Sequence, residues 1–262
     1  MEFPLSRAAA SVIDILPEAG STNDELVSRA TGADRADWPD LAVVVTDNQT
    51  KGRGRLGRTW VSPPGKAFAA SILVRPSETG AQLPMDRFGW FPLIAGLAMT
   101  RTLRTVVPAG VALKWPNDVL IGGRKVCGIL SELLPDASGV VIGAGLNLTL
   151  ESEELPVDTA TSLLLAGATE TDADRLLAGY LREFIALYRS FLAVGGDPDS
   201  SGLLRAVGDA CDTIGRAVRV ELPSGANLLG TATGIDAEGR LLVESETGIT
   251  AVAAGDVTHL RY

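Results

Sequence analysis

The segment 51–58 reads Lys-Gly-Arg-Gly-Arg-Leu-Gly-Arg, with four cationic side chains and three glycines in eight residues. Arginine forks suit carboxylate and phosphate groups, and glycines let a backbone wrap closely around a ligand. Scattered surface lysines would be enough for solubility and would not need glycines between them. The pattern therefore favours a mobile anion-binding loop over a solvated basic patch.

The same glycines also fit a dinucleotide-binding fingerprint, G-x-G-x-x-G, at Gly52, Gly54 and Gly57. That fingerprint binds pyrophosphate only when its third glycine opens a helix. Here Pro63-Pro64-Gly65 follows shortly afterwards, and this sequence cannot continue a helix. We therefore do not expect a Rossmann site.

Two more motifs carry polar chemistry. Ser21-Thr22-Asn23 precedes a helix-like run at residues 24–30, and taken alone it is a helix N-cap. Lys114-Trp115-Pro116-Asn117-Asp118 brings a cation, an aromatic ring, a rigid turn, an amide and a carboxylate together at a strand end. A plain turn would explain the Pro-Asn-Asp part but not the lysine and the tryptophan.

A further lysine, Lys125, begins an otherwise apolar strand after Gly123-Arg124. A lysine at a strand edge commonly guards against edge pairing. The preceding turn could also bring Lys125 beside Lys114, and two converging amines would suit a triphosphate or a mixed anhydride. Gly143-Ala144-Gly145-Leu146-Asn147 then ends another strand with small residues and an amide, which by itself does not define a site.

Composition limits the classes of function. The chain has 262 residues, 46% of them hydrophobic, and a formal net charge of -9, which favours a globular core and argues against general nucleic-acid binding. The only histidine, His259, is expected to be structural, so the chain lacks the histidines that Ser-His-Asp, Cys-His and multi-histidine metal sites need. There is no P-loop, and no apolar run is long enough for a membrane span. We expect a cytoplasmic protein with no DNA or membrane partner; if it is an enzyme, it acts by positioning and electrostatics.

Periodicity predicts an α+β fold in which these motifs lie at strand ends and helix starts. The predicted strands of the first part are 41–46, 67–74, 111–115, 125–134 and 140–148, with a helix near 87–106. An apolar stripe from Leu176 to Leu192 predicts a second helix, capped at Thr171 with Asp174 and stopped by Gly195-Gly196.

The character of the chain changes after residue 212. Short strands predicted at 217–222, 228–234, 241–244 and 249–253, separated by turn residues, indicate a small β-barrel. We therefore divide the chain into domains at 1–212 and 213–262. About fifty residues are marginal for independent stability, so the second domain is expected to lean on the first.

Taken in chain order, the motifs closely resemble those of the biotin protein ligases. The segments that carry the resemblance are Ser21-Thr22-Asn23, Gln49 with residues 52–60, residues 114–118, residues 123–130 and residues 143–147. The resemblance implies an α+β catalytic domain similar to class II aminoacyl-tRNA synthetases, followed by an SH3-like β-barrel. It also implies a two-step reaction, in which biotin and MgATP give biotinyl-5′-AMP and pyrophosphate. A lysine of the biotin carboxyl carrier domain of an acyl-CoA carboxylase then takes the biotin and releases AMP.

The family pattern also implies roles for individual residues. Around the biotin head it places Ser21, Thr22, Asn23 and Gln49. Over the biotin acyl chain and carboxylate it places Arg53, Gly54 and Arg55. At the nucleotide and its phosphates it places Arg55, Arg58, Lys114, Asn117 and Asn147, with Trp60 beside the adenine. Lys125 would contact the carboxylate and the α-phosphate, and Asp118 would either help to hold Mg²⁺ or position the incoming lysine; the catalytic set is thus Lys125, Arg55 and Asp118.

Some features depart from the family pattern or leave alternatives open. Only about twenty residues precede Ser21, too few for the helix-turn-helix domain of bifunctional members, so we expect no repressor activity. Cys127 stands where the family usually has a smaller residue such as alanine, and we interpret it as structural. Lipoate ligases share the catalytic fold, although the Arg-Gly-Arg loop favours biotin. A biotin-sensing regulator without catalysis is the other alternative, and the acidic charge counts against it.

Overall fold

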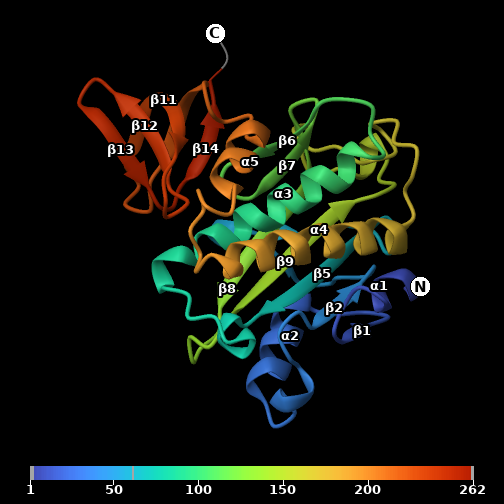
Figure 1. Ribbon diagram of the computed structural model, residues 1–262. Coiled ribbons are helices and arrows are strands. Elements are labelled where there is room, and N and C mark those ends of the chain that lie inside the picture. Colours follow the sequence, from blue (N-terminus) through green and yellow to red (C-terminus); the bar gives the residue numbers. More distant parts are fainter. Residues whose placement is uncertain (1–2, 61, 261–262) are drawn as a thin grey trace.

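A mixed seven-stranded sheet forms the centre of the molecule (Figure 1). The computed structural model describes residues 3–60 and 62–260. In spatial order the strands are β1 (Ile13–Ile15), β2 (Val43–Thr46), β5 (Ala67–Val74), β9 (Val140–Asn147), β8 (Arg124–Leu133), β7 (Asp118–Ile121) and β6 (Val111–Lys114). The first pair is parallel and all the other pairs are antiparallel.

Helices cover both faces of this sheet. They are α1 (Pro4–Arg7), α2 (Thr22–Thr31), α3 (Trp90–Arg104), α4 (Ala173–Ala193) and α5 (Leu203–Ala210), with 3-10 turns at Arg35–Asp37, Arg55–Gly57, Pro76–Thr79, Met85–Arg87 and Ser152–Glu154. Successive side chains of a strand point to opposite faces. Val43 and Val45 accordingly join the core beneath α3 and α4, while Val44 packs with Leu26 of α2 on the other side.

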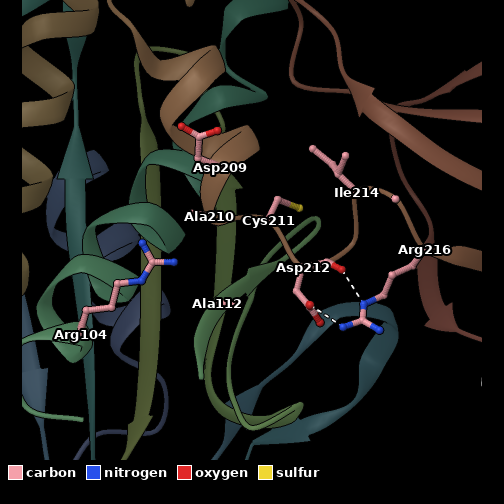
Figure 2. Close-up of a pocket in the computed structure, with 9 residues that line it drawn as sticks. Arg104, Ala112, Asp209, Ala210, Cys211, Asp212, Ile214 and Arg216 are labelled. Atoms are coloured by element: carbon pink, nitrogen blue, oxygen red, sulfur yellow. Dashed lines mark hydrogen bonds and ion pairs between the residues drawn. The ribbon is translucent and has the colours of Figure 1, made fainter. Parts of the chain in front are cut away.

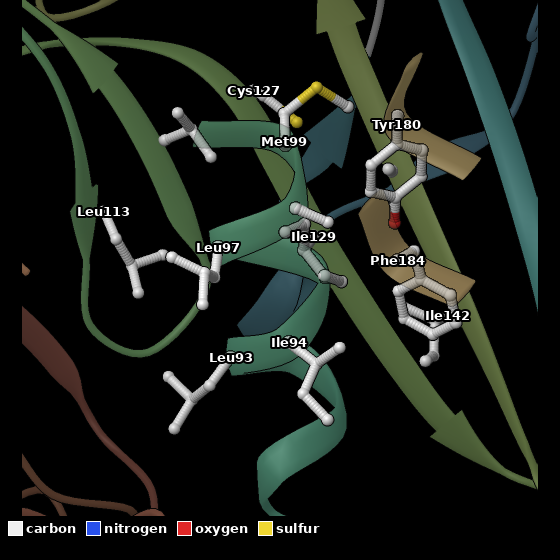
Figure 3. Packing of buried hydrophobic residues seen from close by; sticks show 14 of the residues in the cluster. Leu93, Ile94, Leu97, Met99, Leu113, Cys127, Ile129, Ile142, Tyr180 and Phe184 are labelled. Carbon is white, nitrogen blue, oxygen red and sulfur yellow. The ribbon is translucent and has the colours of Figure 1, made fainter. Parts of the chain in front are cut away.

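The main core lies between the sheet and the pair α3 and α4 (Figure 3). Ile94 and Leu97 of α3 face Ile129 of β8, and Tyr180 and Phe184 of α4 complete the layer. All five side chains are at most 2% exposed. This layer fixes the face of β8 and β9 that carries helices and leaves the other face for α2 and the lining of a cavity.

A second sheet follows α5 and is antiparallel throughout. Its strands are β10 (Ala217–Glu221), β11 (Asn227–Ile235), β12 (Leu241–Ser245), β13 (Gly248–Val252) and β14 (Asp256–His259), in the order β13-β12-β11-β10-β14. It stands beside one end of the helical layer, drawn in red in Figure 1. Its buried residues continue the main core, and Trp115 donates a hydrogen bond from Nε1 to Gly239 O at 3.0 Å. The small β module leans on the larger part, as expected.

The structure confirms the predicted α+β class, with strands and helices starting and ending within a few residues of the expected positions. One detail was wrong: α4 is capped by Asp172, not Thr171, because the Asp172 carboxylate accepts the backbone N–H of Arg175 at 2.8 Å. The sequence gave no indication of β7 or α5, whereas the strand-like stretch around His259 is β14. Among the described residues before Ser21, the regular elements are α1 and β1. Within residues 3–60 and 62–260, no helix has the length and apolar character needed to cross a bilayer.

Candidate active site

One cavity of about 890 Å³ gathers every predicted site residue. It lies between the β8–β9 face of the large sheet, the loop 51–60 and the start of β14. Its lining includes Ser21, Thr22, Asn23, Gln49, Arg53, Gly54, Arg55, Arg58, Trp60, Lys114, Asn117, Asp118, Lys125 and Asn147. Its size is typical of a site for a small organic ligand. Segments that are far apart in the sequence therefore meet in a single cavity.

One end of this cavity is uncharged: Ser21, Thr22, Asn23 and Gln49 line it, and Ser71 contacts Thr22 and Asn23 from behind. We call these five residues the neutral end. Ser21 is the N-cap of α2, and its Oγ accepts the N–H of Asp24 at 3.5 Å. The backbone N–H and the hydroxyl of Thr22 both approach Gln49 Oε1, at 2.9 and 3.2 Å. The N-cap interpretation is therefore right, and the same helix start also lines the cavity.

Glycines on β9 let other side chains approach the sheet closely. A Cβ atom on Gly145 would lie 2.6 Å from the ring of Trp60, and a Cβ on Gly143 would overlap Asn23 Oδ1. Close approach of this kind is possible only without a side chain. The small residues of the 143–147 motif thus form the floor beneath Trp60 and Asn23.

The loop 51–60, which we call the lid loop, crosses the mouth of the cavity. Its strands β3 (Gly52–Arg53) and β4 (Thr59–Trp60) pair with each other, and Leu56, in the left-handed region at φ 56°, is exposed at the turn between them. The segment after Gly57 is a strand and not a helix, which excludes the dinucleotide-fingerprint geometry. The expectation that these glycines do not form a Rossmann site is therefore confirmed.

Arginines tie the lid loop to both parts of the protein. Arg55 donates hydrogen bonds to Asn117 Oδ1 at 3.1 Å and to the backbone oxygen of Gly255 at 3.0 Å. Arg58 forms an ion pair with Asp256 at the start of β14. Burial lowers the pKa of Arg55, whereas the hydrogen bond to Asp256 raises the pKa of Arg58. The lid loop therefore bridges the large sheet and the C-terminal sheet.

The opposite, charged end of the cavity is formed by residues that we call the cationic end: Arg55, Arg58, Lys114, Asn117, Asp118 and Lys125. Lys114 and Asp118 lie opposite each other in the β6–β7 pair, across the turn with the cis Trp115-Pro116 bond. The ammonium of Lys125 lies 2.5 Å from Asp118 Oδ1, yet this buried oxygen accepts no hydrogen bond of good geometry among the described residues. The contact is thus a close charge pair between Lys125 and Asp118.

Other residues of the predicted site support this arrangement. Asn147 donates from Nδ2 to Thr161 O at 2.9 Å, and Asn117 donates from Nδ2 to Ile129 O at 2.6 Å. The Lys125 ammonium also lies 5.8 Å from the centre of the Trp60 ring. The single histidine, His259, contacts Thr213 Oγ1 at 3.1 Å and joins β14 to the linker, in keeping with a structural part.

Cys127 lies beneath the cavity floor, in the hydrophobic core beside Met99 (Figure 3). The side chain is 0% exposed, and burial raises the pKa of its thiol to about 12. A thiol in that state stays protonated near neutral pH and is a poor nucleophile. The structural interpretation of Cys127 agrees with this environment.

A second, shallower cleft of about 380 Å³ lies at the junction of α5, β6 and the C-terminal sheet (Figure 2). Arg216 donates to the carboxylate of Asp212 across it, at 2.5 Å between Nη2 and Oδ1. None of the residues predicted for the site lines this cleft. The chemistry predicted from the sequence therefore belongs to the larger cavity.

Comparison with known proteins identifies the family. The family model described as Biotin/lipoate A/B protein ligase matches residues 21–147, and the model of the biotin protein ligase C-terminal domain matches residues 213–260. The biotin–[acetyl-CoA-carboxylase] ligase of Mycobacterium tuberculosis is 40% identical over 253 residues, covering 95% of this chain and 89% of the relative. The chain belongs to the biotin protein ligase family.

Other biotin protein ligases agree in sequence and fold. The bifunctional ligase/repressor BirA of Escherichia coli is 31% identical, over 94% of this chain and 73% of its own length. The Aquifex aeolicus biotin protein ligase in complex with biotin and ATP superposes with a TM-score of 0.76 at 25% identity, covering 96% of this chain and 100% of that structure. The Leishmania major biotin protein ligase in complex with biotinyl-5-AMP gives 0.60 at 25% identity, covering 93% and 99%. The resemblance in sequence motifs is confirmed, and the chain is a ligase enzyme of this family.

Sequence reasoning missed several residues that this biotin protein ligase places at the cavity. Ser71 contacts Thr22 and Asn23, Glu132 contacts Asn23 and Arg53, and Asp256 pairs with Arg58. Glu132 could have been noticed, because it is an acidic residue two positions after Leu130 on a strand of apolar character. Ser71 and Asp256 gave no local signal, since their partners are far away in the sequence.

Proposed function

We propose that this biotin protein ligase activates biotin with MgATP and transfers it to a lysine of a biotin carboxyl carrier domain of an acyl-CoA carboxylase. The supporting observation is that one cavity has a neutral end lined by small polar groups and a cationic end lined by lysines and arginines. A cyclic urea needs the first environment, and a triphosphate needs the second. In the first step a biotin carboxylate oxygen attacks the α-phosphorus of ATP, and pyrophosphate leaves.

The neutral end is assigned to the biotin head. Ser21, Thr22, Asn23 and Gln49 offer hydroxyl and amide groups that can satisfy the C=O and N–H groups of the ureido ring. Ser21, Thr22 and Asn23 are at most 5% exposed and Gln49 is half-buried, so little water competes and each such hydrogen bond discriminates strongly. Arg53 and Gly54 belong to the part of the lid loop that closes over the acyl chain and carboxylate.

The cationic end is assigned to the nucleotide and the reacting groups. Lys125 contacts the biotin carboxylate and the α-phosphate, and it stabilises the charge that develops as the anhydride forms. Arg55, Arg58, Lys114, Asn117 and Asn147 hold the phosphates and the nucleoside, and Trp60 lies against the adenine. Their present partners, such as Asp256 for Arg58, are groups that the phosphates would replace.

The residues of the cavity fit a magnesium ion that stays mainly on the nucleotide. Within residues 3–60 and 62–260 there is no group of three or more metal-binding side chains, whereas the cationic end offers one carboxylate, Asp118, which is paired with the Lys125 ammonium 2.5 Å away. Magnesium bound to phosphates commonly takes only one or two protein carboxylates, and it would neutralise phosphate charge. We assign Asp118 to the cations of both steps: the metal first, and the incoming lysine afterwards.

In the second step the uncharged lysine amine attacks the carbonyl carbon of biotinyl-5′-AMP. The bond from the carbonyl carbon to the phosphate oxygen breaks, and AMP leaves with the electron pair. The Asp118 carboxylate is the group that receives the ammonium of the carrier lysine and accepts its proton. No side chain of the enzyme acts as nucleophile, in keeping with the burial of Cys127.

We further assign residues 1–212 to the biotin- and ATP-binding domain and residues 213–262 to an SH3-like domain, of which 1–2 and 261–262 lie outside the described residues. We place the enzyme in the cytoplasm, where acyl-CoA carboxylases work and where its two cysteines, both free and buried, would stay reduced. We propose neither DNA nor a membrane as a partner.

Biotin-dependent exchange of labelled pyrophosphate into ATP tests this function. The purified protein should exchange label only when biotin is present, and it should then biotinylate a carrier domain. Calorimetric titration with biotin and with lipoate separates the two ligands of the wider family. Absence of exchange at saturating biotin, or tighter binding of lipoate than of biotin, would contradict the proposal.

A further inference from the structure

The Glu132 carboxylate lies at the border between the neutral end and the lid loop. It stands on β8 two residues after Leu130, so both side chains project from the same face of the sheet. Its side chain is 33% exposed, and the described residues within reach of its oxygens are hydrogen-bond donors. A partly buried carboxylate on a largely apolar strand is costly unless it is paired or hydrogen-bonded.

Two donors from different elements share this carboxylate. Asn23 of α2 donates from Nδ2 to Glu132 Oε2 at 2.6 Å, and Arg53 of the lid loop places Nη2 3.0 Å from Oε1 and 3.1 Å from Oε2. The same Arg53 nitrogen lies 2.6 Å from Asp24 Oδ1. Burial alone would lower the pKa of Arg53, but the charges of Glu132 and Asp24 outweigh it and raise that pKa. The Arg53 guanidinium is thus held by protein carboxylates.

The contact with Glu132 also fixes the orientation of the Asn23 amide. Nδ2 has two hydrogens, and its acceptors are Glu132 and Leu130 O, the latter at 3.2 Å. Oδ1 therefore faces Ser71, whose Oγ lies 2.6 Å away and has one proton to donate. A flipped amide would place its NH₂ group against the Ser71 hydroxyl and its oxygen against the Glu132 carboxylate, where two acceptors would repel each other.

This orientation propagates into the neutral end. Because the Ser71 proton is used toward Asn23, Ser71 Oγ can only accept from Thr22, whose Oγ1 lies 2.8 Å away. The single Thr22 hydroxyl proton is then used toward Ser71, and Gln49 Oε1 is held by the backbone N–H of Thr22 at 2.9 Å. One chain of side-chain hydrogen bonds therefore runs from Arg53 through Glu132, Asn23 and Ser71 to the Thr22 hydroxyl.

We propose that Glu132 is a positioning residue that sets the hydrogen-bond polarity of the biotin-head pocket and couples it to the lid loop. This inference rests on the proposed function. A charged acceptor at the end of the chain determines in which direction the Ser71 and Thr22 hydroxyls donate in the pocket assigned to the ureido ring. The same carboxylate holds Arg53, so that ordering of the head pocket and closure of the lid loop reinforce each other.

Glu132→Gln tests this role, because the amide keeps the size but loses the charge, and its NH₂ group must face one of the two donors, the Asn23 NH₂ or the Arg53 guanidinium. We expect the KM for biotin in pyrophosphate exchange to rise about tenfold, with kcat nearly unchanged. The KM for ATP should stay within about twofold of the parent value, because the cationic end is untouched. Glu183→Gln is the matched control: this exposed glutamate on α4 pairs with Arg101, 3.4 Å away, and the change should leave all constants unchanged.

Asp24→Asn separates the two tasks of Glu132. Asp24 holds Arg53 but has no contact with the Asn23 side chain, so this variant should release biotinyl-5′-AMP faster while the KM for biotin stays close to the parent value. In the double variant Glu132→Gln with Arg53→Gln, the loss of biotinyl-5′-AMP retention should be smaller than the sum of the losses in the two single variants. Glu132→Asp restores the charge and should recover part of the biotin affinity.

The possible outcomes are distinguishable. If the parent protein neither exchanges pyrophosphate nor binds biotin by calorimetry, the proposed function fails and this inference fails with it. If the parent is active and Glu132→Gln binds biotin equally well, only the inference is overturned. It is also overturned if Glu132→Gln raises the KM values for biotin and ATP by the same factor and lowers the unfolding temperature, because that result would describe a general structural role.

Discussion

At the neutral end of the cavity, the side chains are buried and hydrogen-bonded to one another, whereas at the cationic end they are partly exposed and paired with carboxylates. Thr22 and Asn23 are 3% and 4% exposed, but the side chains of Lys125 and Arg58 are 34% and 63% exposed. The first arrangement can receive an uncharged ring without rearranging its charges. In the proposed function, the lysines and arginines of the second exchange Asp118 and Asp256 for phosphate oxygens when the nucleotide binds. On that proposal, specificity for biotin is built into the fold, whereas the ion pairs of the cationic end rearrange on binding.

The sharpest test of this contrast is Lys125→Ala at the cationic end. The ammonium is the group assigned to the developing charge on the carboxylate and α-phosphate, and loss of one such group typically costs about 100- to 1000-fold in rate. We expect kcat for pyrophosphate exchange to fall by that factor, while biotin binding by calorimetry weakens by a smaller factor of about tenfold, because the biotin carboxylate loses one charged contact. Arg124→Gln is the control, because this exposed neighbour does not line the cavity. Equal losses in the two variants would remove Lys125 from its assigned role.

Arg55→Gly tests whether the lid loop retains the intermediate. The side chain bonds both Asn117 and Gly255 O, and its removal breaks the link between the two parts of the protein. We expect release of biotinyl-5′-AMP to accelerate about 10- to 100-fold and bystander lysines to become biotinylated. Filter-binding of labelled intermediate measures the release rate. Arg55→Lys keeps the charge without the fork and should fall between glycine and the parent; unchanged retention in Arg55→Gly would contradict the assignment.

Ser71→Ala probes the neutral end. It leaves the buried Asn23 Oδ1 without its donor, and an unsatisfied buried group costs about 1–3 kcal/mol. The KM for biotin should rise about tenfold, by the same factor at low and at high salt, because no net charge is involved. Ser28→Ala, on the exposed side of α2, should leave KM unchanged. A strong salt dependence in Ser71→Ala would break the distinction between the two ends.

The sequence predicted the cationic end better than the connections that organise it. Lysines, arginines and glycines at strand ends are visible locally, so Lys114, Lys125 and the lid loop could be found from their types and spacing. Ser71 and Glu132 contact partners that the fold brings from distant segments, and only Glu132 has a local signal, as an acidic residue two positions after Leu130. The helix α5 was not predicted for a related reason: it is short, and packing rather than local periodicity stabilises it.

The ion pair between Arg58 and Asp256 should give the smallest effect. Exposed ion pairs contribute about 0–1 kcal/mol, so Asp256→Asn should change the KM for ATP by no more than about fivefold. Two effects oppose each other: the variant loosens the lid loop, but it also frees Arg58 for phosphate. Screening weakens the parent pair, so the difference between variant and parent should shrink as ionic strength rises.

The same pair also depends on pH. Burial raises the pKa of Asp256, but Arg58 outweighs burial and lowers that pKa, so the pair persists at neutral pH and is lost only as the pH falls through the lowered pKa. Asp209→Asn, at an exposed pair on α5, is the matched control. A salt-independent effect of Asp256→Asn would mean that Asp256 acts through packing, and the cationic end would then resemble the neutral end more than its exposure indicates.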